Sequence, residues 1–460
     1  MPLTTRPDTE ASFPDASRAS SQRSGRPNAI PDPLYGAIRL SAWAAAIVAT
    51  PPFQRLARVS LSDAPGELLF SRPFPTRLDH TLGVYHLARA ARPRDRTLQA
   101  AALFHDLGHG PFSHLTEPLM REWLGMDHEE RSIALIGAVR EQLSPAASRQ
   151  LRWLDWNEVA AILRGKDALD RGGLLAGRLD YDNADNLARF LRASGLGAPS
   201  YHPETLARAL RPLSTDSARD ESDSEQSPGG HHGAARPMIA AAQPAGPLHR
   251  AYLLAGAEEE ARGWLADRTT VYRFLHEGHQ NLAAHAMLRK AVDLAAATNI
   301  LPPDFFDFGD EQALDLFARA LDRGLVALVE RVRSGPEALH RCVWEAEAPA
   351  AQPEIPARFA RFRDRLAVEA QLAAESALAP HEVIVEALVS SGARALPPIA
   401  TTPTMTTGHP RELVWQPEPP PSPRVLHVFV AAGVGRDYQR RARVAAERMF
   451  RPLGAVAREG

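Results

Sequence analysis

The segment 98–117 carries the side chains of this sequence that are best suited to bind a metal ion. His105 and His109 are four residues apart, so a helix running through His105 would present both imidazoles on one face. Asp106 adjoins His105, and imidazoles with a carboxylate suit Zn, Fe, Mn, Co or Ni rather than Ca. Antiparallel packing of two predicted helices would bring His80 beside them. Histidines that only form buried hydrogen bonds are the alternative, but so dense a cluster favours a metal site.

Histidine and cysteine usage limits which metal sites this 460-residue chain could form. Cys342 is the only cysteine, which excludes a disulfide scaffold, a CxxC zinc site and an iron–sulfur cluster. Any metal must therefore be held by His, Asp or Glu. Six of the 17 histidines fall within residues 80–128: His80, His86, His105, His109, His114 and His128. The formal net charge of −2 gives no reason to expect a nucleic-acid coat or a membrane-surface protein.

Helical periodicity predicts the elements that position these residues. Apolar residues recur at three- and four-residue spacing in Leu82–Ala91, Thr97–Phe104, Glu129–Leu143, Glu158–Leu163, Asp180–Leu191, Glu258–Ala284, Met287–Ala297, Glu311–Arg333 and Arg358–Ala379. Strand patterns occur late in the chain, at His381–Leu388 and Arg424–Ala431. The predicted fold class is therefore mainly α, with a small α+β part at the C-terminal end.

Three segments interrupt this pattern. Residues 1–30 are polar and rich in Ser, Arg and Pro, and residues from about 214 to 246 are polar and rich in Ser, Asp, Glu, Gly and Pro, which predicts disorder in both segments. Pro397–Pro423 is proline-rich and predicts an extended loop. The first residues contain no apolar stretch of the kind found in secretory signals, and no run of 18 apolar residues occurs, so we expect a soluble, cytoplasmic protein.

Several short motifs follow one another in an order typical of one superfamily. They are Arg77-Leu78-Asp79-His80, His105-Asp106-Leu107-Gly108-His109-Gly110-Pro111-Phe112-Ser113-His114, His128-Glu129 and Arg178-Leu179-Asp180-Tyr181. With them the chain resembles the HD superfamily of metal-dependent phosphohydrolases, in particular the branch of deoxynucleoside triphosphate triphosphohydrolases. The resemblance covers about residues 31–295. It implies an HD-type helical bundle over residues 31–345, followed by the C-terminal α+β subdomain over residues 346–460.

The resemblance also implies roles for individual residues. His80, His105 and Asp106 would hold one divalent ion, which could be Mn, Mg, Fe, Co, Ni or Zn. His109 and His128 would lie near the reacting phosphate, where a histidine can protonate the leaving oxygen. The remaining implied contacts are to the substrate: Arg77 to the phosphates, Gln54, Arg55, His114 and Glu117 around the nucleotide, and Tyr181 and Asp185 at the sugar 3′-hydroxyl.

The sequence departs from the family's pattern where a fourth metal ligand is expected. Gly177 stands at the position of the family's aspartate, and glycine offers no side-chain ligand. Asp180 lies nearly one helical turn later and is the predicted replacement, unless it keeps a structural role of its own. Asp167, Asp170 and Asp182 are nearby, and we interpret each as a helix-terminal carboxylate that faces solvent.

The main hypothesis is therefore a metal-dependent phosphohydrolase of nucleotides, with (deoxy)nucleoside triphosphates as substrates and a homo-oligomeric assembly. Two further departures favour alternatives: Ser60-Leu61-Ser62 replaces a family glutamine, and Trp264 lies near the position of a family arginine. The alternatives are a degenerate protein that binds a nucleotide or a partner without turnover, and a phosphatase of a monophosphate or an unusual nucleotide. His276 and His279, three residues apart, either line a pocket or lie on a partly exposed helix face.

Overall fold

The structure is a computed structural model that describes residues 29–70, 73–213, 251–348, 359, 361–389, 396–400, 413–414 and 424–457. Within them the chain is mainly helical, with a four-stranded antiparallel sheet near the C-terminal end, which confirms the predicted fold class. Residues 1–28 of the predicted tail and the whole predicted segment 214–246 lie outside the described residues. Ala29 and Ile30, placed in that tail, begin the short strand β1 (Ala29–Asp32), which pairs with β2 (Gly36–Arg39).

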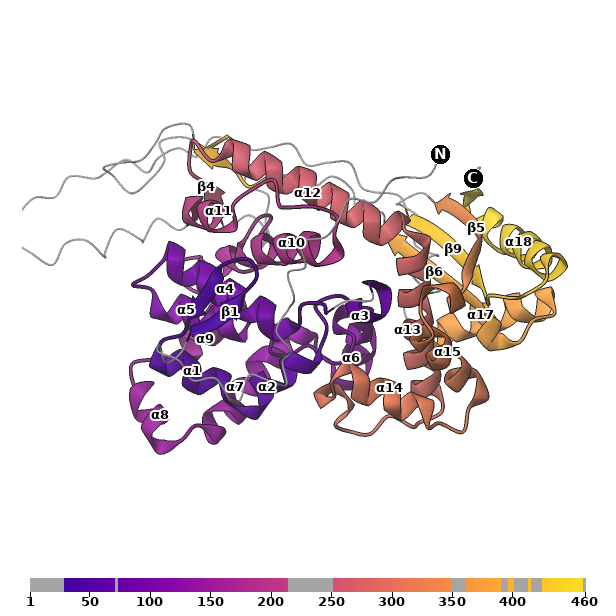
Figure 1. Cartoon of the computed structure of the whole chain (residues 1–460), viewed down its shortest axis with the longest axis horizontal. Coiled ribbons are helices and arrows are strands. Elements are labelled where there is room, and N and C mark those ends of the chain that lie inside the picture. Colours follow the sequence, from indigo (N-terminus) through magenta and orange to yellow (C-terminus); the bar gives the residue numbers. More distant parts are fainter. Residues whose placement is uncertain are drawn as a thin grey trace, which may run out of the picture.

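Two long helices connect the first half of the chain to the C-terminal sheet (Figure 1). They are α12 (Glu258–Glu277), which packs against α10, and α13 (His279–Ala297), which packs against the sheet. Gly278 leaves the helical conformation, with φ −75° and ψ 98°, and so divides the stretch Glu258–Ala284 that periodicity predicts as one helix. The break turns the chain and places His279 at the first position of α13.

A helical hairpin carries the first two histidines of the motif. It consists of α4 (Arg77–Ala91) and α5 (Arg96–Phe104), which pack against each other. Thr76 starts α4 with a capping box, and the Asp95 side chain accepts a hydrogen bond from the first turn of α5. Because the helices are antiparallel, the start of α4 lies beside the end of α5. The predicted approach of His80 to His105 is thereby confirmed.

Two further helices begin at the same end of this hairpin. One is α7 (His128–Gln142), which starts with a capping box between Asp127 and Glu130. The other is α10 (Tyr181–Ser194), whose N-cap is Asp180. Residues in the first turns of both helices therefore approach the histidines of the hairpin.

The C-terminal sheet has the strand order β10-β5-β9-β6. The two predicted strands are confirmed as β6 (Val383–Val389) and β9 (Arg424–Val430), which pair antiparallel along their whole length. A third strand, β5 (Arg341–Ala348), is absent from the sequence prediction and runs across the domain boundary predicted after residue 345. The short strand β10 (Val456–Ala457) pairs with β5 at the edge.

Alternate residues of these strands pack on opposite faces of the sheet. Val383 and Val385 join the apolar core formed with α17 (Phe362–Ser376) and α18 (Arg436–Phe450). Ile384 and Phe429 belong instead to the core that contains the buried residues of α13. The sheet therefore lies between α13 and the α17–α18 pair.

A buried ionic network also fixes α13 to the C-terminal subdomain. Arg289 donates hydrogen bonds to Asp293 (2.7 Å), Glu369 (2.7 Å) and Glu386 (2.9 Å), and Lys290 Nζ lies 3.0 Å from Glu369 Oε2. All five side chains are at most 8% exposed. Such a network holds one arrangement because each buried charge requires its partner.

The remaining elements complete the bundle. The other helices are α1 (Ala42–Val48), α2 (Pro51–Arg55), α3 (Gly66–Phe70), α6 (Glu117–Leu124), α8 (Pro145–Gln150), α9 (Trp156–Leu163), α11 (Pro203–Ala209), α14 (Asp310–Ala318) and α15 (Arg323–Arg333). A small sheet joins β3 (Leu210–Pro212), β4 (Ala251–Leu253), β7 (Ile399–Ala400) and β8 (Leu413–Val414), so two pairs of residues from the predicted proline-rich loop are strands. Among the described residues, no helix is both long enough and apolar enough to span a membrane.

Candidate metal centre and adjoining pocket

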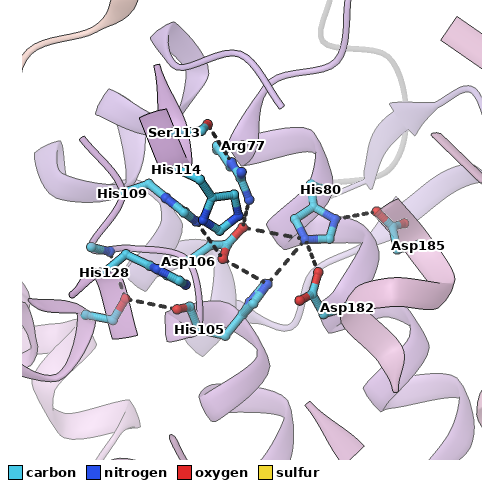
Figure 2. Close-up of polar contacts among 12 residues, drawn as sticks. Arg77, His80, His105, Asp106, His109, Ser113, His114, His128, Asp182 and Asp185 are labelled. Atoms are coloured by element: carbon cyan, nitrogen blue, oxygen red, sulfur yellow. Dashed lines mark hydrogen bonds and ion pairs between the residues drawn. The ribbon is translucent and has the colours of Figure 1, made fainter. Parts of the chain in front are cut away.

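Three predicted ligands converge at the end of the hairpin (Figure 2). Nε2 of His80 lies 3.3 Å from Nε2 of His105 and 3.5 Å from Asp106 Oδ2, and Nε2 of His105 lies 3.5 Å from Asp106 Oδ1. All three residues are buried. Ligand atoms about 2.0–2.2 Å from one ion, at tetrahedral or octahedral angles, are roughly 2.8–3.6 Å apart. The observed separations fit such an ion.

The hydrogen bonds of both histidines direct their free nitrogens to the same point. Nδ1 of His105 lies 2.9 Å from the carbonyl oxygen of Ala102, which can only accept, so Nδ1 carries the proton. Nδ1 of His80 lies 2.8 Å from the carboxylate of Asp185 and carries its proton for the same reason. In the neutral state the two Nε2 lone pairs therefore face each other beside a carboxylate. A cation between them satisfies all three groups.

A further carboxylate, that of Asp182, adjoins this centre. Its Oδ1 lies 2.9 Å from Nε2 of His80, and the side chain is 32% exposed. Although burial lowers it, hydrogen bonds to Asp182 and Asp185 raise the pKa of His80 to about 9. Burial raises the pKa of Asp182, but the hydrogen bond to His80 outweighs this and lowers it. Asp182 is therefore ionised, and from the first turn of α10 it offers a carboxylate oxygen that could bind a metal ion.

Asp180, the predicted replacement ligand, is engaged as the cap of α10. Its carboxylate accepts hydrogen bonds from the backbone N–H of Asn183 (2.7 Å) and of Gly177 (2.6 Å), and from the Asn183 side-chain amide. A side chain at position 177 has no room, because a Cβ there would lie 2.5 Å from the carbonyl oxygen of Gly173. The structure thus gives Asp180 the structural role that the sequence left open.

The other histidines of the motif form a cluster beside the ligands. The rings of His109 and His128 stack with centroids 4.1 Å apart and an interplanar angle of 10°, and His114 meets both edge-on. Nδ1 of His128 lies 3.3 Å from Oε1 of Glu117, and Nδ1 of His114 lies 3.1 Å from Oε2 of the same carboxylate. Nε2 of His109 is 3.3 Å from Asp106 Oδ1.

Burial and charge drive the pKa values of the two stacked imidazoles apart. Burial lowers the pKa of His109 well below its usual value, and the positive charges of Arg77 and His128 lower it further. Burial also lowers the pKa of His128, but its hydrogen bond to Glu117 reverses the effect, so the net shift is upward. His109 is accordingly neutral near pH 7, and His128 is the better proton donor of the pair.

Arg77 connects the ligands to the neighbouring loop. Its Nη1 donates to Asp106 Oδ2 (2.7 Å) and its Nε donates to Ser113 Oγ (2.9 Å). Burial raises the pKa of Asp106, but the charges of His105 and Arg77 lower it well below its usual range. Asp106 is therefore ionised, which is the state in which a carboxylate binds a metal ion.

Two buried arginines fix the backbone of the loop after Asp106. Arg55 donates to the carbonyl oxygens of Leu107 (2.7 Å) and His109 (2.5 Å), and Arg131 donates to that of Gly108 (2.8 Å). A Cβ at Gly108 would lie 2.0 Å from the carbonyl oxygen of His128, so only glycine allows α7 to approach. These contacts fix the loop that carries His109 relative to α7, the helix that begins at His128.

A cavity of about 330 Å³ adjoins Arg77 and His114, which belong to its lining. This volume lies at the lower end of the ~300–1,000 Å³ typical of small-molecule sites. Its apolar walls include Leu61, Phe70 and Phe190. Its polar lining residues include Asp63, Asn183, Asn186, Asn281 and His285. Among the described lining residues, Arg77 is the single arginine, and there is no lysine.

Four other predicted substrate contacts lie elsewhere. Gln54 is exposed and donates to the carbonyl oxygen of Val48 (2.8 Å). Arg55 binds the loop described above, and Tyr181 is fully buried in the apolar core, where burial raises the pKa of its hydroxyl to about 12. Asp185 is fully buried and orients His80. None of the four lines the cavity.

Sequence reasoning set Asp182 aside and did not identify Ser113 or Arg131 as parts of the centre. The spacing of Asp182 and Asp185, i and i+3 on α10, was a usable signal, since it puts both carboxylates on one helix face. Of the later histidines, His285 lines the cavity, whereas His279 does not, and the side chain of His276 lies outside the described residues.

Comparison with known proteins agrees with this geometry. Residues 77–191 match the HD domain family. The chain is 30% identical over 184 residues to the uncharacterized protein YwfO of Bacillus subtilis, covering 36% of this chain and 40% of that protein. It is 35% identical over 124 residues to the human deoxynucleoside triphosphate triphosphohydrolase SAMHD1, covering 23% of this chain and 20% of that protein.

A third relative is a deoxyguanosinetriphosphate triphosphohydrolase-like protein of Brucella ovis, 33% identical over 88 residues, which cover 17% of this chain and 22% of that protein. The matched part thus spans less than half the length of each of these relatives. The chain contains an HD domain. It is distantly homologous to the human triphosphohydrolase and to the triphosphohydrolase-like protein of Brucella ovis.

Proposed function

We propose that this protein is a metal-dependent phosphohydrolase of nucleotides, with His80, His105, Asp106 and Asp182 as the metal ligands. The observation that carries the proposal is the pair of Nε2 atoms of His80 and His105, 3.3 Å apart, beside the Asp106 carboxylate. A divalent ion bound there supplies a Lewis acid that polarises a phosphoryl oxygen. The adjoining cavity gives a nucleotide access to this centre.

The chain's own residues supply binding and proton transfer. Arg77 lines the cavity beside Asp106, and its guanidinium is placed to donate to a phosphate oxygen. In the hydrolysis, the oxygen of water bonds to phosphorus and the bond from phosphorus to the leaving oxygen breaks. His128, held at Nδ1 by Glu117, gives the proton of its Nε2 to that leaving oxygen. Neutral His109, stacked on His128, accepts a proton from the water.

The proposed substrates are deoxynucleoside triphosphates, because two of the homologous proteins carry that activity in their names.

A second candidate, a nucleoside monophosphate, is favoured by the charge of the cavity. Arg77 is the one arginine among its described lining residues, and Asp63 adds a negative charge. A monophosphate brings fewer negative charges to this lining than a triphosphate does. The homo-oligomer and the cytoplasmic location also stay predictions.

Product analysis separates the two substrates. Purified protein with Mn, Mg, Fe, Co or Ni is incubated with each dNTP and each dNMP, and the products are identified by ion-exchange chromatography. Triphosphate with nucleoside supports the first substrate, and inorganic phosphate with nucleoside supports the second. Release of neither from any nucleotide with any of these metals would overturn the proposed activity.

The ligand assignment is tested by two aspartate variants on one helix end. Asp182→Ala is expected to weaken Mn²⁺ binding in calorimetry, because it removes an ionised donor. Asp180→Ala is expected to keep Mn²⁺ affinity and to lose about 1 kcal/mol of stability, because it removes a helix cap. Loss of Mn²⁺ binding in Asp180→Ala but not in Asp182→Ala would reverse the assignment.

A further inference from the structure

A second group of metal-ligating side chains lies at the junction of α13 and the C-terminal sheet. His279 is the first residue of α13, Glu345 lies on β5 and His427 lies on β9. Oε2 of Glu345 is 3.2 Å from Nε2 of His279 and 3.6 Å from Nε2 of His427. One ligand atom from each of the three residues lies within 4.8 Å of those of the other two. None of these residues belongs to the HD centre, the proposed site formed by His80, His105, Asp106 and Asp182.

Three separate features of the fold bring this group together. Glu345 and His427 are direct cross-strand partners, so their side chains leave the sheet on the same face. That face is the one covered by α13. Phe429, two residues after His427, packs in the apolar core that contains the buried residues of α13. The break at Gly278 then ends α12 and points the start of α13 at the pair.

The distances and the donor types fit a zinc ion. Donors about 2.0–2.2 Å from Zn²⁺ at tetrahedral angles are roughly 3.3–3.6 Å apart, close to the two separations measured from Glu345 Oε2. Two imidazoles and one carboxylate are the ligands of many open zinc sites, in which a water or an external group takes the fourth position. The three side chains differ in exposure: His427 is 2% exposed, Glu345 is 21% exposed and His279 is 55% exposed. An ion can therefore enter from the solvent side.

We propose that His279, Glu345 and His427 form a second divalent-metal site, which binds Zn²⁺ and connects α13 to β5 and β9. The site has a structural consequence for the cavity. Asn281, Leu282 and His285, all within two turns of His279, belong to the cavity lining. Zinc would fix the start of α13 and, with it, this wall of the cavity. The site does not depend on the proposed hydrolysis.

Zinc stoichiometry tests the proposal. The background is tag-free full-length protein with His105→Gln, a substitution chosen to disable the HD centre. This protein is titrated with Zn²⁺ in calorimetry. Its bound zinc is then measured by mass spectrometry after dialysis. One zinc per chain is expected. Adding His279→Gln should abolish this equivalent. Adding His202→Gln, which changes another exposed histidine paired with a glutamate, should leave it in place.

A cobalt spectrum provides a second readout. Co²⁺ in the His105→Gln background should give visible absorption of a four-coordinate site, and this absorption should be lost with His279→Gln or Glu345→Gln. His279 is half-exposed, so its variant should fold, which circular dichroism checks. Retention of the zinc equivalent and of the cobalt spectrum in folded His279→Gln would overturn the proposal. Absence of bound zinc in the His105→Gln background would also overturn the proposal. That result would not bear on the HD centre.

Discussion

Asp185 Oδ2 lies 2.8 Å from Nδ1 of His80, on the side of the ring opposite the metal centre. The carboxylate is fixed in turn by Arg189, whose Nε donates to it (2.7 Å), and by the Tyr35 hydroxyl (2.8 Å). Gly83 permits this approach, because a Cβ there would lie 1.9 Å from Asp185 Oδ1. The orientation of one proposed metal ligand is therefore set by α10 and by the turn between β1 and β2.

Replacing this orienting carboxylate should weaken metal binding without removing a ligand. Asp185→Asn keeps the size of the side chain but removes its charge, so His80 becomes less basic and less firmly oriented. Affinity for Mn²⁺, measured by calorimetry, should fall by about 10- to 100-fold. Asp437→Asn, on the exposed start of α18, serves as the control and should leave affinity unchanged. Equal Mn²⁺ affinity in Asp185→Asn and the wild type would contradict the orienting role.

The proposed acid should affect turnover and leave metal binding intact. His128→Gln removes the proton donor that Glu117 supports, so kcat on the accepted nucleotide should fall by about 100- to 10,000-fold. Mn²⁺ affinity should stay within a few-fold of the wild type, because His128 is outside the ligand set. His202→Gln, which changes an exposed histidine paired with Glu260, is the matched control. Unchanged kcat in His128→Gln would exclude it as the acid.

Removing one member of the buried network on α13 should strongly destabilise the fold. Glu369→Gln leaves Arg289 and Lys290 with reduced charge compensation in a site closed to water. Urea unfolding should show a loss of about 3–5 kcal/mol. Glu375→Gln on the same helix breaks an ion pair with Arg448 that is largely exposed, and should cost only about 0–1 kcal/mol. Similar losses in both variants would show that burial does not decide the contribution of Glu369.

A buried histidine directly before β5 should make stability depend on pH. Burial lowers the pKa of His340 to about 3, and its Nε2–H donates to the carbonyl oxygen of His381 (3.1 Å). An unfolded histidine titrates near 6.5, so between about pH 6.5 and 3 the unfolded state binds the extra proton. The free energy of unfolding should therefore fall by up to about 1.4 kcal/mol for each pH unit below 6.5.

His340→Gln removes this titration, so the variant should lose less stability than the wild type between pH 6.5 and 5. Urea unfolding of both proteins across that range measures the difference between their slopes. Equal slopes would mean that His340 takes up its proton in the folded state.

The sequence by itself determined the hairpin and the residues proposed as its ligands. Capping residues and three- to four-residue periodicity specify α4 and α5, and the family motif assigns His80, His105 and Asp106 to one ion. These features are local, or repeat a pattern that recurs across a superfamily. The strands β6 and β9 were also accessible, because each is a largely apolar run rich in β-branched residues over a whole strand length.

Only the tertiary structure distinguishes the contacts of the two carboxylates at the start of α10. Asp180 and Asp182 are two residues apart, and sequence spacing alone cannot state which one faces His80. The choice depends on the rotation of α10 about its axis, which is set by packing: Asp180 turns back to cap the helix, and Asp182 turns to the histidine. The cluster of His279, Glu345 and His427 was inaccessible for the same reason, since it joins residues up to 148 positions apart through strand register and a helix break at Gly278.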